Sequence, residues 1–185
     1  MGSVNLQQLK MTDLKKYLAS KNQPELIREI LDLCKLFSNV KEYYAAKIVP
    51  DAEQEVLEKY MKIIKNEFFP DRGFGKLRYS IINKAISDFK KVSKTPIHIA
   101  ELMVSCVENG VEFTNAYGDI DERFYIKMVA MYENAADYVM KETLEDTFQK
   151  RFWKIVDESA GIGWGFYEAL IETYYSYFDD EEASV

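Results

Sequence analysis

A basic loop near position 73 of this 185-residue chain carries the side chains with the clearest chemical potential. Gly73-Phe74-Gly75-Lys76 precedes a run of apolar residues at helical spacing, with Arg72 and Arg78 on either side. Backbone amides at a helix start, together with basic side chains, can hold a phosphate or carboxylate. The spacing is not that of the GxxxxGK[ST] phosphate loop. Arg72, Lys76 and Arg78 are therefore the candidate anion-binding residues, although such a segment is commonly an ordinary interhelical loop with solvated charges.

A second set of basic side chains has the spacing of a phosphate-binding stripe. Lys84 and Lys91 lie seven residues apart on one face of a predicted helix, and Lys15 and Lys16 lie in an earlier one. Such stripes bind nucleic-acid backbones, although exposed helix faces are commonly charged in any case. These four lysines are the candidate nucleic-acid contacts. Because the net charge of −7 opposes polyanion binding, no measurable binding to duplex DNA or RNA is expected at physiological salt.

The residues that usually carry catalysis or hold metals are sparse. His98 is the single histidine, and Glu101 follows it three residues later, whereas helical metal sites need several ligands from different helices. Cys34 and Cys106 are too far apart to suggest a thiolate zinc site. A pair of carboxylates remains open, because the chain has 31 acidic residues and none is singled out. We therefore expect no catalytic residues, no metal, no cofactor and no enzymatic activity.

Composition indicates a folded protein with a core. The hydrophobic share is 48% and the aromatic share 14%, and the few glycines and prolines leave little room for the turns of an all-β fold. Both cysteines lie in apolar helical patterns, which is typical of reduced thiols. No apolar run approaches the roughly 20 residues that cross a bilayer. A cytoplasmic protein with no membrane contact is expected.

Apolar residues recur at helical spacing along nearly the whole chain, and no stretch alternates as a strand does. Asn22 or Gln23, Thr95, and Asp119 or Asp121 are the expected N-caps. The fold class is all-α, either an irregular multi-helix bundle or a short stack of antiparallel helix pairs. The expected helices cover 6–20, 24–37, 38–48, 51–68, 77–92, 95–140 as a helical hairpin, 144–159 and 166–178.

The hairpin over 95–140 is the predicted centre of the fold. Pro96 directly after Thr95 favours a helix start, and Gly118 suits the end of the first arm. The second arm is apolar nearly all round, which is typical of a helix buried among others. The second-arm residues that predict this are Phe124, Tyr125, Ile126, Met128, Val129, Met131 and Tyr132.

The chain length favours a single helical domain over 1–185, with a possible sub-boundary at the loop 69–76. The acidic tail over 179–185 is predicted to be disordered. Charge is distributed unevenly, with +6 over 1–94 and −13 over 95–185. The alternative interpretations of this asymmetry are chance, a basic docking face on the first half, and head-to-tail association between the halves.

Two stretches resemble known families. Leu14-Lys15-Lys16-Tyr17-Leu18, followed by the run from Pro24 to Leu33, is similar to the paired helices of SAP-like nucleic-acid-binding modules, but the glycine usual between those helices is missing. The segments 101–103, 111–114 and 117–120 resemble an uncharacterised family of bacterial all-helical proteins. That resemblance implies an all-α domain in a bacterial cytoplasm and implies no activity.

The leading functional hypothesis is a non-enzymatic cytoplasmic helical interaction module, whose partner is another protein or a second copy of the chain. The 13 tyrosines and 11 phenylalanines favour it, because aromatic side chains are enriched at contact surfaces as well as in cores. The alternatives are a nucleic-acid-associated protein that uses the basic N-terminal half, and a small anionic-ligand-binding protein.

Overall fold

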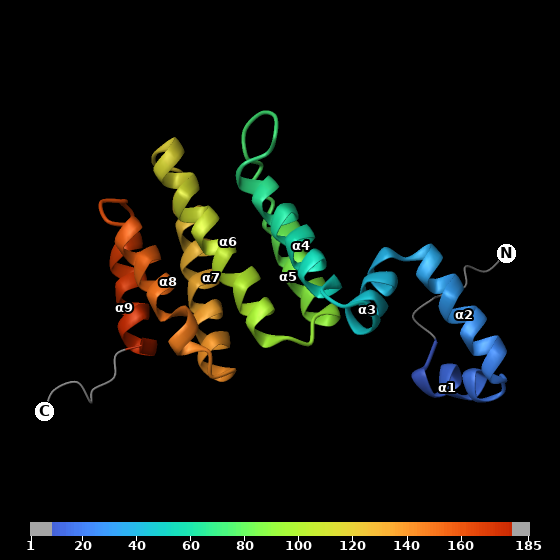
Figure 1. Ribbon diagram of the computed structural model, residues 1–185. Helices are drawn as coiled ribbons and strands as arrows, with labels where there is room; N and C mark the ends of the chain where they lie inside the picture. Colours follow the sequence, from blue (N-terminus) through green and yellow to red (C-terminus); the bar gives the residue numbers. More distant parts are fainter. Residues whose placement is uncertain (1–8, 179–185) are drawn as a thin grey trace, which may run out of the picture. The chain divides into compact units, whose positions relative to one another are not determined.

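A computed structural model describes residues 9–178, and in this range the chain forms α-helices and no strand (Figure 1). The all-α prediction is confirmed. The acidic tail lies outside the described residues. The helices are α1 (Met11–Ala19), α2 (Gln23–Leu36), α3 (Ser38–Ile48), α4 (Ala52–Phe68), α5 (Tyr79–Val92), α6 (Pro96–Tyr117), α7 (Glu122–Lys141), α8 (Glu145–Glu158) and α9 (Phe166–Phe178).

The chain divides into two compact units, Met1–Tyr44 and Ala45–Val185, called unit 1 and unit 2 below. The division falls inside α3, whereas the loop 69–76, the sub-boundary expected from sequence, lies within unit 2. The assignment of 1–185 to a single domain stays a prediction. None of the helices in 9–178 is long and apolar enough to cross a membrane.

Unit 1 contains a helical hairpin of α1 and α2, whose turn is stabilised by local hydrogen bonds. Asn22 accepts a hydrogen bond from the backbone N–H of Glu25 (3.0 Å), and the Glu25 carboxylate accepts one from the Asn22 N–H (2.9 Å), which forms a capping box. The Tyr17 hydroxyl donates to Glu29 across the hairpin (2.9 Å), and Lys21 pairs with the same carboxylate (2.6 Å). Polar contacts therefore join α1 to α2.

Unit 2 is built from antiparallel pairs that lie side by side, and the expected stack of helix pairs describes it (Figure 1). α6 lies at the centre, where it packs against α4, α5, α7 and α8, and α7 also packs against α9. Most of α6 is apolar, so a position inside the stack buries apolar side chains on several of its faces. The predicted central hairpin is thus the centre of unit 2.

The contact between α6 and α7 is close because a glycine meets a methionine. A Cβ added at Gly110 would lie 2.1 Å from the Met128 sulfur, which is itself fully buried. At one end of this pair, Tyr125 donates to Asp119 (2.8 Å) and shares a hydrogen bond with Thr114 (2.8 Å). At the other, Arg151 of α8 binds two glutamates of α6, Glu101 and Glu108.

Several local expectations are corrected. Asp121, and not Asp119, caps α7 by accepting from the Phe124 N–H (2.8 Å). Thr95 precedes α6 but makes no side-chain cap, because its hydroxyl donates to Glu53 (3.0 Å). α5 begins at Tyr79 rather than 77, since Leu77 has a positive φ of 50° that a helix does not accept. Ile126 of α7 is exposed, so this helix is not buried all round.

Candidate functional site

The first candidate surface is the apolar side of α2. Helical spacing places its apolar residues within one broad stripe, defined here as the α2 apolar face. Ile27 is 51% exposed, Leu31 55% and Phe37 51%, and none of the described residues of unit 1 is buried. Large apolar patches of this kind mark contact sites in soluble proteins. The residues of the α2 apolar face are Ile27, Ile30, Leu31, Leu33 and Phe37.

The predicted anion-binding loop contains a structural ion pair. The guanidinium of Arg78 donates to both carboxylate oxygens of buried Glu67 (2.7 and 2.9 Å), and the Arg78 N–H adds a third bond (3.1 Å). These bonds hold the pKa of Glu67 below its usual value, although burial opposes them. Gly75 lets the loop approach α4, since a Cβ there would lie 2.3 Å from the Phe68 carbonyl oxygen. Arg78 is thus neutralised by Glu67.

Arg72 and Lys76 are exposed in the same loop, and Lys76 contributes weakly to the lowered pKa of Glu67. The structure therefore brings Lys76 and Arg78 near one carboxylate of the protein itself. Binding of an external anion at Arg72, Lys76 and Arg78 stays a prediction.

The predicted nucleic-acid lysines fall in different units. Lys15 and Lys16 lie on α1 in unit 1, whereas Lys84 and Lys91 lie on α5 in unit 2. The last two share one partner, because Lys84 and Lys91 (3.1 Å) both pair with Asp88. Exposed pairs of this kind stabilise a protein little, but they lower the local positive charge. A role for these four lysines in nucleic-acid binding stays a prediction.

His98 takes part in a polar network where α4 meets the start of α6. Glu53 accepts hydrogen bonds from the Ser93 hydroxyl and from the N–H (3.2 Å) and hydroxyl (3.0 Å) of Thr95, and His98 Nδ1 lies 3.3 Å from it. Burial raises the pKa of Glu53, but these donors outweigh it and the pKa is lowered. The network fixes the α5–α6 connection. Within 9–178, no group of His, Cys, Asp and Glu is arranged to hold a metal ion.

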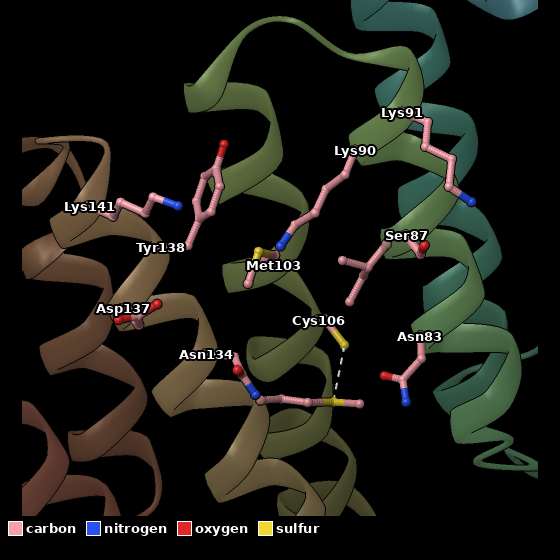
Figure 2. A pocket seen from close by; sticks show the side chains of 12 residues that line it. Asn83, Ser87, Lys90, Lys91, Met103, Cys106, Asn134, Asp137, Tyr138 and Lys141 are labelled. Atoms are coloured by element: carbon pink, nitrogen blue, oxygen red, sulfur yellow. Dashed lines mark hydrogen bonds between the residues drawn. The ribbon is translucent and has the colours of Figure 1, made fainter.

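Unit 2 contains a groove of about 640 Å³ between α5 and α7, with α6 as its floor (Figure 2). Figure 2 shows Lys90 and Lys141 extending from opposite walls toward the same end of the groove, next to Tyr138. The Lys90 ammonium lies 4.8 Å from the centre of the Tyr138 ring. Below them, Met103 and Cys106 form an apolar floor.

The electrostatics of the groove follow from this placement. Loss of water around Lys90 lowers its pKa, and the nearby Lys141 lowers it further, while Asp137 opposes both. Burial raises the pKa of the Cys106 thiol to about 12, so this sulfur is an apolar, unreactive part of the floor. Its thiol contacts the Met131 sulfur (3.8 Å). The groove therefore has one cationic end and an apolar, sulfur-rich floor.

Sequence reasoning missed this groove. It treated Met131 as buried core, placed Lys90 only beside the candidate nucleic-acid stripe of Lys84 and Lys91, and gave no role to Lys141. A weak signal existed, since Asn83 and Lys90 on α5, and Asn134 and Lys141 on α7, are each seven residues apart and so lie on one face of their helix. The signal could not be used without knowing that these two faces meet across α6.

The fold is all-α and multi-helical. Its two candidate surfaces are the α2 apolar face in unit 1 and the groove with one cationic end in unit 2. The chain belongs to the Family of unknown function (DUF6155), whose model matches residues 9–179. The expected membership of an uncharacterised family is confirmed. No curated protein and no solved structure matches the chain significantly.

Proposed function

We propose that this protein is a non-enzymatic helical interaction module of the cytoplasm, and that the α2 apolar face binds a protein partner. The single observation that carries the proposal is that unit 1 exposes large apolar side chains and has no buried residue among those described. Segments below about 40 residues rarely bury enough apolar surface to be stable alone. A partner that covers this face stabilises the hairpin and removes the apolar side chains from water.

The simplest partner is a second copy of the chain. A patch present on each copy can cover itself around a two-fold axis, so one apolar face serves both sides of the interface. A different protein with an apolar groove is the other partner that fits. The cytoplasmic location is supported by Cys34 and Cys106, which are free thiols.

The test compares two variants with the same change in net charge. Ile27→Glu/Leu31→Glu places two carboxylates on the α2 apolar face, while Arg28→Glu changes the net charge equally at an exposed polar position of the same helix. Light scattering after size exclusion measures the oligomeric state, and binding of a fluorescent dye specific for apolar surfaces measures exposure of the face.

We expect a wild-type dimer that the double variant dissociates and Arg28→Glu leaves intact. A monomer whose dye binding is lost only in the double variant supports a different protein as partner. A wild-type monomer whose dye binding is unaffected by Ile27→Glu/Leu31→Glu would overturn the proposal, because the face would then not be available for contact.

A further inference from the structure

The groove of unit 2 has the features of a small-ligand site. Its volume of about 640 Å³ lies within the usual range of about 300–1,000 Å³ for ligand pockets. Its polar side chains lie along two walls, and the buried side chains of Met103 and Cys106 lie beneath them. We propose that this groove binds a small amphiphilic anion, with its carboxylate or phosphate group between Lys90 and Lys141 and its alkyl chain along the α6 floor.

The cationic end accounts for the head group. Lys90 and Lys141 come close enough to repel, and among the described residues no carboxylate lies within ion-pair distance of either. Lys91 also lines the groove, but its ammonium is already paired with Asp88 (3.1 Å). An anion between Lys90 and Lys141 removes their mutual repulsion and gains charge-assisted hydrogen bonds.

The negative net charge of unit 2 contrasts with the cationic end of the groove. The sequence of unit 2 has 17 Lys and Arg against 26 Asp and Glu, so a site for anions has to be built by specific placement of cations. Burial of Lys90 and the nearby Lys141 lower its pKa, and Asp137 offsets them only in part.

The floor accounts for the rest of the ligand. Met103, Cys106 and half-buried Met131 present sulfur and methylene groups, which are polarizable and adapt to the shape of a flexible chain. Asn83 and Asn134 line the walls beyond the lysines and suit hydrogen bonding at the edge of a ligand. A single alkyl chain fits this volume, whereas a whole partner helix, with a diameter of about 10 Å or more, is too large.

Isothermal titration calorimetry with the full chain tests the proposal. The probes are octanoate, octyl phosphate, octanol and inorganic phosphate, which separate the carboxylate, the phosphate, the alkyl chain and the head group alone. The variants are Lys90→Gln/Lys141→Gln for the cationic end and Met131→Gln for the floor. Lys84→Gln on α5 is the control, since Lys84 lies outside the groove lining and pairs with Asp88.

We expect octanoate or octyl phosphate to bind more tightly than octanol and inorganic phosphate. Lys90→Gln/Lys141→Gln lowers that affinity at least about tenfold, because charge-assisted hydrogen bonds are lost. Met131→Gln lowers the affinity for the two alkyl anions and leaves the affinity for inorganic phosphate unchanged. Lys84→Gln changes neither affinity. The preferred anion identifies the head group as carboxylate or phosphate.

Equal binding of octanol and the two alkyl anions, or affinities that Lys90→Gln/Lys141→Gln leaves unchanged, would overturn the proposal. Failure of all four probes to bind at millimolar concentration would do the same. Circular dichroism of each variant shows whether unit 2 stays folded, and a variant that loses helicity is replaced by Lys90→Ala or Lys141→Ala alone. These results are independent of the α2 apolar face, which lies in unit 1.

Discussion

Unit 1 and unit 2 are both built from amphipathic helices, but they differ in what covers the apolar side. In unit 2, six helices from α4 to α9 pack against one another, and residues such as Val104 and Met128 are fully buried. In unit 1, α2 has the same pattern of apolar spacing, yet Ile27 and Leu31 are exposed. Amphipathic spacing favours a helix, but burial of its apolar side needs neighbours that supply complementary surfaces.

The two units therefore differ in the kind of surface that they offer to other molecules. Unit 2 buries its own core and carries the groove between α5 and α7. Unit 1 presents apolar surface and is joined within its hairpin mainly by polar contacts such as Tyr17 with Glu29. Surfaces of that kind gain most of their stabilisation when another protein covers them.

A charge placed on an apolar side chain is expected to affect the stability of the two units very differently. Met128→Asp in unit 2 is expected to lower the free energy of unfolding by about 4 kcal/mol, because an unpaired carboxylate is buried and the contact with Gly110 is lost. Ile27→Asp in unit 1 is expected to change it by less than about 0.5 kcal/mol in the monomer. Urea unfolding measures both. Ile126→Asp, at an exposed position of α7, is the control for the effect of Asp in that helix.

Equal losses for Met128→Asp and Ile27→Asp would show that the apolar face of α2 is as well covered as the core of unit 2. The contrast between the units would then be wrong.

A second effect concerns the two thiols, one in each unit. Cys106 is buried and its pKa is raised to about 12, whereas Cys34 is half-buried on α2. At pH 8 we expect iodoacetamide to modify Cys34 on the order of 100 times faster, because alkylation requires an accessible thiolate. Peptide mass spectrometry over time measures the two rates. Comparable rates would mean that the floor of the groove opens readily and that unit 2 is less rigid than its buried core indicates.

The smallest effect is the pH dependence of the Glu67–Arg78 pair in unit 2. Glu67→Gln is expected to lower the free energy of unfolding by about 1–2 kcal/mol at pH 7, since a buried charged hydrogen-bond acceptor is lost while Arg78 stays partly solvated. The pKa of Glu67 in the folded state lies below its usual 4.5. Its stabilisation is therefore complete above about pH 4.5 and disappears as the pH falls through the folded-state pKa.

Chemical denaturation between pH 7 and pH 3 follows this difference, with exposed Glu55→Gln as the control. A Glu67→Gln difference that stays constant over that range would show that the carboxylate does not act through its charge.

Much of the fold could be predicted because it rests on local signals. Pro24 and Glu25 indicate the capping box at Asn22, and Gly118 with Asp121 indicates the break between α6 and α7, since capping involves residues three or four apart. The candidate sites were predicted less well. Arg78 was assigned to an external anion but binds Glu67, eleven residues away, and sequence spacing does not reveal such a pair.

Sequence alone indicates that the described part of this protein is helical and where its helices begin and end within a few residues, and it places the chain in a family of unknown function. These properties depend on hydrogen bonds and side chains within one or two turns. The exposure of the α2 apolar face, the enclosure of α6 and the shared groove of Lys90 on α5 and Lys141 on α7 are visible only in the folded structure. Burial and charge proximity depend on which helix faces meet, and that is set by long-range packing rather than by the periodicity of any one helix.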